Sequence, residues 1–486
     1  MANCNKLFLD FNQNLNVLST KKSKLATSKR ELRRKITDYF KQNHPAYKPK
    51  FFTQGSQKLG TVIRIHDDTC DLDDGVYFLC EPDVTATTLQ RWVHDAVKDH
   101  TSEPAQWRKK CIRVTYKADY HIDLPVYYML ASEDHPHLAV KNEDWQDSDP
   151  KEFITWFRKQ RDAKGQLVRL VKYLKSWCDW CAHKMPSGLC MTVLAQRNFV
   201  ANDRDDCALR ALLKAIRNDL QREWKCTMPT TPQDDLLSKY SDELKRNFFD
   251  ALDEFIDDAD EAVDDEKNQL LASKLWRHHL GSRFPDGLDE DVDAKEARLR
   301  ASATLITSGR AATTAAVGIT TQGQGVANQP HRFYGGRRFH PLARRGKDWF
   351  AVFHREKQLV ERHYPAFRCQ LHRSALCCRG EVASPGGEGT YQIKINYAPG
   401  QPPKVFVLNA DMEFQNHAFT HFYPADNSLC LYYPGDLTWS DKHHLHDKTI
   451  PWLAEWLVFY ELYQITGRWE GHAVDTRGQD LPIKPS

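Results

Sequence analysis

The sequence lacks any apolar run of the roughly 18 to 20 residues that a membrane-spanning helix needs. It also lacks a secretory start, because its first residues, MANCNKLFLDFNQN, have no basic segment followed by an apolar core. These two absences argue against a membrane-embedded or secreted protein. We therefore expect a cytoplasmic protein with no membrane partner.

A strong excess of one charge is missing as well, since 68 Lys and Arg face 65 Asp and Glu for a formal net charge of +3. This balance points to no particular class of partner. The 13 cysteines are an odd number, so we expect reduced thiols, including Cys369, Cys377 and Cys378. A globular composition and a length of 486 residues predict about two to three domains.

The stretch 55–75, GSQKLGTVIRIHDDTCDLDDG, holds the strongest candidate site. Side chains alternate between the faces of a strand, so Asp71 and Asp73 point the same way. Two carboxylates about 7 Å apart on one face can hold a pair of Mg²⁺ ions, which clamp the oxygens of a phosphoryl transfer. Gly55 lets the backbone approach a phosphate, and Ser56 adds a hydroxyl and an N–H at an expected helix N-terminus.

A third carboxylate is expected on a neighbouring strand, and Asp123 in the stretch YHIDLPVY is the candidate. A lone Asp-x-Asp would be read as an ordinary Asp-rich turn. Here a Gly-Ser turn, a spacer, an Asp-x-Asp and a distant strand aspartate follow in order, which favours a metal site. Asp71, Asp73 and Asp123 are thus predicted to hold two Mg²⁺ ions, and one carboxylate could also accept the proton of the attacking hydroxyl.

This arrangement resembles the nucleotidyltransferases of the polymerase-beta superfamily, and within them the bacterial cGAS/DncV-like cyclic-oligonucleotide synthases. The matching residues are Gln54-Gly55-Ser56, Gly60-Thr61, Asp71-Leu72-Asp73-Asp74-Gly75 and Ile122-Asp123. The resemblance implies an α+β domain over 1–285. Its catalytic strands would lie at about 50–130 and a helical second lobe at about 150–285.

The resemblance also implies that ATP and GTP are the substrates. A lysine on the amphipathic helical stretch 166–182, either Lys172 or Lys175, would help to hold a triphosphate. The helical stretch 21–41 has a strongly basic face that could bind nucleic acid. We favour a solvated helix packed along the catalytic sheet, because no aromatic residues for base stacking interleave with the charges.

Residues 286–340 change in composition, because small and polar residues dominate and aromatics are absent as far as residue 330. Such a segment cannot bury enough apolar surface to fold alone, which predicts a flexible linker. The following PHRFYGG, residues 330–336, resembles the tail of cyclic-oligonucleotide synthases whose terminal residue is conjugated to a target. An ordinary glycine-containing turn explains it equally well.

Residues 341–486 show another ordered set of features. They are a helix at 350–365, a strand at 391–397, a proline turn into a strand at 402–408, His421, Leu429-Cys430-Leu431 and Trp439. The order resembles ubiquitin-conjugating enzymes, in particular the bacterial variants encoded beside cyclic-oligonucleotide synthases in antiphage operons.

That resemblance implies an α/β domain in which Cys430 carries an acyl group as a thioester, since a thiolate is both a strong nucleophile and a good leaving group. Leu429 and Leu431 should lie in the wall of the domain and leave the sulfur at the surface. His421 occupies the place of the histidine of the conjugating-enzyme motif. The asparagine of that motif is missing, so the sequence identifies no oxyanion-stabilising group.

Together these features predict a Mg²⁺-dependent nucleotidyltransferase that makes a cyclic di- or oligonucleotide messenger, similar to cGAMP, from nucleoside triphosphates in antiphage defence. A thioester-forming conjugation domain follows it. The expected partners are nucleoside triphosphates, a separate effector activated by the product, and an acyl donor or target protein for Cys430. Two alternatives stay open: a linear nucleotide-adding transferase acting on RNA, and a binding and conjugation module with a vestigial nucleotidyltransferase. The intact Gly-Ser pair and the three carboxylates argue against the second.

Overall fold

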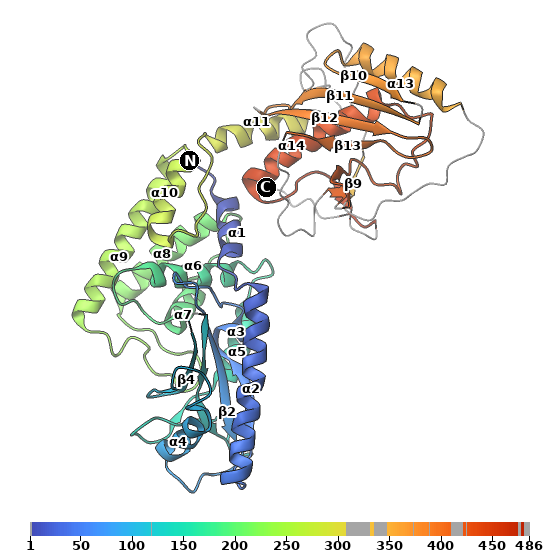
Figure 1. Cartoon of the computed structure of the whole chain (residues 1–486). Helices are drawn as coiled ribbons and strands as arrows, with labels where there is room; N and C mark the ends of the chain where they lie inside the picture. Colours follow the sequence, from blue (N-terminus) through green and yellow to red (C-terminus); the bar gives the residue numbers. More distant parts are fainter. Residues whose placement is uncertain are drawn as a thin grey trace. The chain divides into compact units, whose positions relative to one another are not determined.

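The computed structural model describes residues 2–117, 119–307, 331–334, 348–372, 374–387, 389–409, 421–423, 425–474 and 478–480. The chain divides into two compact units, unit 1 (Met1–Glu290) and unit 2 (Asp291–Ser486), and each is described by itself. Figure 1 labels their helices and strands. In the described part of the chain, no helix combines the length and the apolarity that a membrane span requires.

Unit 1 contains an eight-stranded sheet with the order β3-β4-β5-β2-β6-β7-β8, in which β1 also pairs with β2. The central strand β2 (Asp71–Phe78) runs parallel to β5 (Tyr120–Leu124) and β6 (Val126–Tyr128), and antiparallel to β1 (Pro49–Gln54). The remaining strands are β3 (Gln106–Trp107), β4 (Ile112–Tyr116), β7 (His137–Leu138) and β8 (Gln146–Asp147). The strand that carries the Asp-x-Asp motif is therefore paired on both sides.

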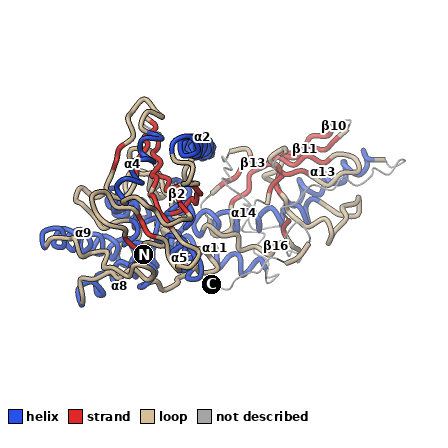
Figure 2. The backbone as a smooth tube through the Cα atoms, turned by 90° about the horizontal axis from the view of Figure 1, so that it is seen from below, coloured by secondary structure: helices blue, strands red, loops and turns tan. Residues whose placement is uncertain are grey.

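Helices α2 (Ser19–Asn43) and α4 (Ala86–Val97) cover one face of this sheet. Figures 1 and 2 show α2 running beside β2. The apolar stripe of α2 shares one core with the inward side chains of β2; its members are Leu25, Leu32, Ile36 and Phe40. The basic residues of α2 thus lie on a helix packed along the sheet, as predicted.

An ion pair fixes the direction in which the acidic side chains of β2 point. Arg33 of α2 donates from Nε and Nη2 to the two carboxylate oxygens of Asp74, at 2.7 and 2.6 Å, and Thr53 Oγ1 donates to the same carboxylate at 2.8 Å. Asp74 is 1% exposed. Because neighbouring residues of a strand face opposite sides, Asp71 and Asp73 are directed to the other face.

The rest of unit 1 is the helical lobe that the sequence predicts. Its helices are α5 (Pro150–Gln160), α6 (Gln166–Trp180), α7 (Gly188–Asn198), α8 (Asp205–Arg222), α9 (Asp242–Asp260), η1 (Glu261–Asp265) and α10 (Gln269–Leu280), and the N-terminal α1 (Asn5–Asn14) packs with them. The short α3 (Gly55–Leu59) follows β1. Rings of Phe8, Tyr173, Trp276 and Phe284 meet with centroids 4.9–5.2 Å apart around Phe8. This aromatic cluster joins the N-terminal helix α1 to the lobe.

Unit 2 contains a four-stranded antiparallel sheet, β10-β11-β12-β13, with the helices α13 and α14. The bounds are α13 (Trp349–His363), β10 (Arg368–His372), β11 (Ala375–Ala383), β12 (Thr390–Tyr397), β13 (Lys404–Val407), η2 (Leu445–Thr449) and α14 (Ile450–Thr466). Two small pairs complete it: β14 (Phe422–Tyr423) with β15 (Ser428–Leu429), and β9 (Phe333–Tyr334) parallel to β16 (Ala473–Val474). The predicted helix and strands of this region are present.

The structure differs from the predicted linker at residues 292–307, which form α11 (Val292–Thr307). This helix contacts α14 and buries four apolar side chains, Val292, Leu299, Ala303 and Ile306. Arg300 also donates to the Glu470 carboxylate, with one N–O distance of 2.9 Å. The prediction rested on the average composition of the segment, which does not show that these four apolar residues recur on one face of a helix. Residues 308–330 and 335–347, including the glycines of the tail-like motif, lie outside the described residues.

The prediction of reduced thiols is wrong for two cysteines of unit 2. Cys369 and Cys378 stand directly opposite each other on β10 and β11, with their Cα atoms 4.0 Å apart, and form a disulfide. The strand register that makes them neighbours could not be read from spacing alone. Cys377 is free, as expected.

Candidate active sites

The sheet register of unit 1 brings the predicted aspartates onto adjacent strands. Asp71 pairs with His121 and Asp73 pairs with Asp123 between the parallel strands β2 and β5. Asp71 and Asp73 line a cavity of about 840 Å³. The cavity is bounded by α3, β2, β8, α5, α6, α7 and the loop at 228–236.

Gly55 and Ser56 reach the same cavity, because α3 begins directly after β1. Gly55 has φ +62°, a conformation that side-chain-bearing residues rarely adopt. A Cβ atom on Gly55 would lie 2.0 Å from Asp73 Oδ2, so only glycine fits against this carboxylate. Ser56 is the second residue of α3, which places it at the helix N-terminus that the sequence predicts.

The electrostatics of this site favour a cation. Burial and the negative charges of Asp71 and Asp123 raise the pKa of Asp73 to about 7, although Lys175 and Arg113 partly oppose the shift. The carboxyl groups therefore repel one another, and Asp71 and Asp73 fit Mg²⁺, whose preferred ligands are oxygens. A divalent ion bound here would neutralise this charge and stabilise the charge of a reacting phosphate.

Asp123 is held by an arginine that the sequence reasoning did not single out. Arg113 on β4 donates from Nε and Nη2 to the two oxygens of Asp123, both at 2.7 Å, and the two residues are register partners. Asp123 is not among the cavity-lining residues, and the three carboxylates are not among the groups of described residues whose ligand atoms all lie within 4.8 Å of one another. Its role as a metal ligand, which would require Arg113 to release it, stays a prediction.

Elsewhere in the described residues, two groups of potential ligands do have all their ligand atoms within 4.8 Å of one another. They are Asp258, His278 and His279 in the helical lobe, and His135, Asp149 and Glu152 near the cavity. In the first group both histidine rings bond to one carboxylate oxygen of Asp258, at 3.0 and 2.8 Å. These contacts link α10 to α9.

The two candidate lysines of α6 point to different places. Lys175 lines the cavity, and its Nζ donates to the carbonyl oxygen of Thr61 at 2.9 Å. Burial lowers the pKa of Lys175, while the charges of Asp71 and Asp73 oppose that shift. Lys172 instead donates to Asn12 and Asn16 beside α1, at 3.1 and 2.9 Å, and burial lowers its pKa to about 8. The geometry therefore favours Lys175 as the triphosphate-binding lysine.

The structure corrects the predicted exposure of Cys430, which is 1% exposed. Its Sγ donates to Tyr423 Oη at 3.2 Å, and the side chain packs with Tyr334, Tyr433 and Val474. Leu429 and Leu431 are buried beside it, as predicted. The sulfur is covered by Tyr334 of β9 and by Tyr423 and Tyr433. Tyr334 is far from Cys430 in the sequence, so the prediction could not include this cover.

His421 is close to Cys430 in the backbone, but its ring is a core side chain. The backbone N–H of Cys430 donates to the His421 carbonyl oxygen at 2.7 Å. The imidazole is buried, 5.8 Å from the Phe333 ring and 4.2 Å from the Trp469 ring between centroids. Burial lowers the pKa of His421 to about 3, against a small opposing effect of the Tyr334 backbone. This placement favours a positioning role for the residue over proton transfer by its ring.

Sequence reasoning missed the tyrosines over Cys430 as well as Arg113. Tyr423 and Tyr433 stand within seven residues of the cysteine, so local aromatic content was the available signal. Nothing in the sequence could show that Tyr334, nearly a hundred residues earlier, belongs to the same apolar cluster as Cys430.

Family models match both units of the chain. Residues 49–127 match the model described as "Cyclic GMP-AMP synthase DncV-like, nucleotidyltransferase domain". Residues 356–476 match the model described as "Type II CBASS E2 protein". A curated relative, the cyclic GMP-AMP synthase of Escherichia albertii, is 26% identical over 259 residues, which cover 48% of this chain. The chain spans 55% of the length of that relative.

Solved structures of the Vibrio cholerae DncV cyclic AMP-GMP synthase share the fold of unit 1. One covers 59% of this chain and 98% of its own, with a TM-score of 0.52 and 16% identity. The complex of that enzyme with nonhydrolyzable GTP has a TM-score of 0.53 and 17% identity, with coverages of 59% and 98%. Its complex with the linear intermediate 5′ pppA(3′,5′)pG has a TM-score of 0.51 and 18% identity, with coverages of 58% and 97%.

Proposed function

We propose that this chain makes a cyclic di- or oligonucleotide messenger in antiphage defence and that Cys430 takes an acyl group from a separate acyl donor, whose leaving group departs as the thioester forms. The proposal is supported by the matches of residues 49–127 to the DncV-like nucleotidyltransferase model and of residues 356–476 to the type II CBASS E2 model. ATP and GTP are the proposed substrates. The product would activate a separate effector protein. The solved DncV structures include complexes with nonhydrolyzable GTP and with a linear intermediate, which supports this choice of substrates.

The observation that carries the first activity is the convergence of unlike groups on one cavity. Gly55 and Ser56 offer backbone N–H groups and a hydroxyl, Lys175 offers a positive charge, and Asp71 and Asp73 offer oxygen ligands. Phosphates bind to N–H groups and lysine, while Mg²⁺ binds to carboxylates together with substrate phosphates. The 840 Å³ cavity lies in the upper part of the roughly 300–1,000 Å³ range of ligand sites.

The test is to incubate the pure protein with all four nucleoside triphosphates and Mg²⁺ and to identify the products by mass. We expect a cyclic product from wild type and a loss of at least about 100-fold in rate for Asp73→Asn, since metal clamps supply several kcal/mol. The matched control is Asp38→Asn, an exposed carboxylate on α2. A product that stays linear would support the alternative of a linear transferase, and wild-type turnover by Asp73→Asn would reject the metal assignment.

Support for the second activity comes from the segment 331–334, which lies in unit 2 beside the cysteine. Arg332 donates to Asp436 at 2.8 Å and to Asp480 at 2.7 Å. Tyr334 packs against Cys430 in one apolar cluster. The part of the tail-like motif that the structure describes is thus held next to the proposed nucleophile, where an acyl group would be transferred.

Conjugation is tested by looking for a reducible adduct on non-reducing gels after incubation with cell extract. Cys430→Ala should lose the adduct and keep nucleotide synthesis, because Cys430 lies in the other unit. Cys377→Ala is the matched control, a free cysteine on β11 of the same unit. An adduct that persists in Cys430→Ala would assign the nucleophile to another cysteine.

A further inference from the structure

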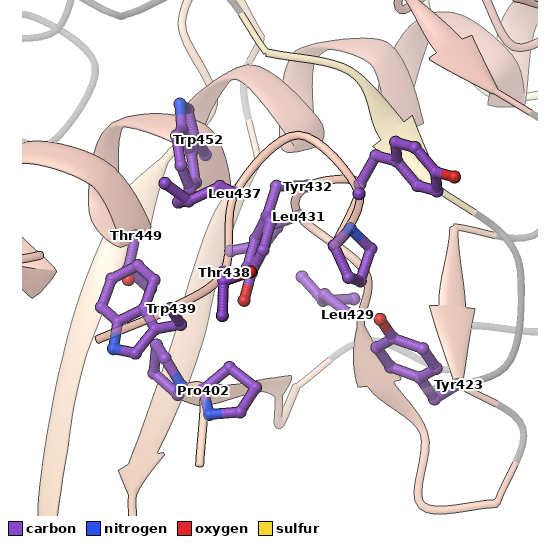
Figure 3. A pocket seen from close by; sticks show the side chains of 14 residues that line it. Pro402, Tyr423, Leu429, Leu431, Tyr432, Leu437, Thr438, Trp439, Thr449 and Trp452 are labelled. Carbon is purple, nitrogen blue, oxygen red and sulfur yellow. The ribbon is translucent and has the colours of Figure 1, made fainter. Parts of the chain in front are cut away.

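A second cavity lies in unit 2, immediately beside Cys430. Its volume is about 340 Å³. The two residues that flank Cys430 in the chain, Leu429 and Leu431, line it together with Tyr423, which accepts the hydrogen bond of the cysteine thiol. Figure 3 shows these side chains around the cavity. Cys430 itself does not line the cavity, but both of its chain neighbours and its hydrogen-bond partner do, so a molecule bound there lies next to the residues that hold the proposed nucleophile.

The lining selects for a neutral, aromatic occupant. The fourteen lining residues include no Lys, Arg, His, Asp or Glu, so neither a phosphate nor a charged side chain would find a counter-charge there. Tyr432 lies 6.2 Å from Trp439 and 5.4 Å from Trp452 between ring centroids. Rings of this kind stack favourably on another aromatic ring. The volume is at the lower end of the roughly 300–1,000 Å³ range of ligand sites and suits a single ring.

One polar group in the wall lacks a partner. Thr449, at the end of η2, lines the cavity and is 2% exposed, and its Oγ1 has no hydrogen-bond partner. Figure 3 places Thr449 beside Trp439 in the wall. A buried hydroxyl without a partner costs free energy, so an occupant with a polar tip is favoured over a purely apolar one.

Phe333 and Tyr334 of the chain's own tail-like segment do not line this cavity. His331 of the same segment stacks on the lining residue Trp452, with ring centroids 4.8 Å apart. Phe333 packs against Phe459 and Trp469, and Tyr334 lies against Tyr433, with ring centroids 5.0 Å apart. Tyr433 also lines the cavity, so it belongs both to the cavity wall and to the contact with this segment. None of the described residues of this segment, 331–334, is among the lining residues, so this part of the segment leaves the cavity available to a second peptide.

We propose that this cavity binds the tyrosine side chain of a partner peptide and so positions that peptide at Cys430. The ring would stack among Tyr432, Trp439 and Trp452, and its hydroxyl would hydrogen-bond to Thr449 Oγ1. This inference deepens the conjugation part of the proposed function by naming the side chain that the partner presents.

Binding is measured directly on the full chain by saturation-transfer NMR titration with small probes. N-acetyl-tyrosinamide should bind saturably, N-acetyl-phenylalaninamide about 3- to 10-fold more weakly because it lacks one hydrogen bond, and N-acetyl-lysinamide not at all. Thr438→Trp, a rim position that is exposed, should abolish tyrosinamide binding by filling the cavity. Thr304→Trp, at an exposed threonine of α11, is the matched control and should bind as wild type does.

A second variant tests the same inference if the Thr438→Trp protein folds poorly. Thr449→Val preserves shape and removes the hydroxyl, so tyrosinamide and phenylalaninamide should then bind equally. The inference would be overturned if Thr438→Trp bound tyrosinamide as wild type does. It would also be overturned if Thr449→Val still preferred tyrosinamide over phenylalaninamide, or if adenosine displaced tyrosinamide from the cavity. A wild type that binds tyrosinamide but forms no adduct with extract would keep the cavity assignment and reject conjugation.

Discussion

Gly55 lies directly against the carboxylate of Asp73. The glycine has a left-handed backbone conformation, and its missing side chain leaves room for the Asp73 carboxylate. Gly55 therefore permits the backbone turn into α3 and also leaves the space that the Asp73 carboxylate occupies. Gly60 makes a useful comparison, because it has a similar φ of +72° but a Cβ on it would approach only Arg161 Nη2, at 3.5 Å.

We predict that Gly55→Ala abolishes nucleotide joining, while Gly60→Ala retains it. Both substitutions should destabilise unit 1 by about 1 to 2 kcal/mol through the strained backbone conformation. Only Gly55→Ala also displaces the Asp73 carboxylate. Activity by product mass and stability by urea unfolding separate the two effects. Equal activity of the two variants would show that the contact with Asp73 does not matter for catalysis.

His421 makes stability depend on pH. Its pKa of about 3 in the folded state lies below the ordinary value of 6.5, so the unfolded chain binds the proton more tightly. The contribution of His421 to stability is then fully present above about pH 6.5 and is lost as the pH falls toward 3.

We expect His421→Phe, which keeps a ring between Phe333 and Trp469, to lose less stability than wild type on acidification. The measurement is the unfolding temperature of unit 2 between about pH 7 and pH 4. His354→Gln, at an exposed histidine of α13, is the control and should follow wild type. Identical acid dependence of wild type and His421→Phe would mean that His421 is not the buried neutral group described above.

At the scale of the element, α11 belongs to the fold of unit 2 because its apolar face is buried. Leu299 is fully buried, whereas Leu305 on the same helix is 48% exposed. Leu299→Ala should destabilise unit 2 by about 2 to 4 kcal/mol, the usual cost of a cavity in a core. Leu305→Ala should change stability by less than about 0.5 kcal/mol. Denaturant unfolding checks both values, and equal effects would show that α11 is not packed.

At the scale of the whole molecule, each unit has its own core, so we predict that the chain can be divided. Fragments 1–290 and 291–486 should fold separately, the first making the nucleotide product and the second forming the Cys430 adduct. A fragment 308–486, which lacks α11, should be less stable than 291–486 because α14 loses its packing partner. Circular dichroism and the two activity assays test this. If neither fragment folds, the boundary at residue 290 is wrong.

The sequence by itself determined the two-unit α+β architecture and most of the candidate residues. Strand alternation placed Asp71 and Asp73 on one face, and the order of Gly-Ser, Asp-x-Asp and a later strand aspartate predicted the candidate site. These are local patterns, because the backbone geometry of a strand or turn fixes the directions of side chains near in sequence.

Only the tertiary structure decided which groups meet across the chain. The β4–β5 register pairs Asp123 with Arg113. Lys172 hydrogen-bonds to Asn12 of α1, whereas Lys175 lines the cavity. Tyr334 of β9 packs in one cluster with Cys430. The same holds for the Cys369–Cys378 disulfide. Each outcome depends on strand register or helix packing, which follow from the burial of the whole apolar surface and leave no trace in local spacing.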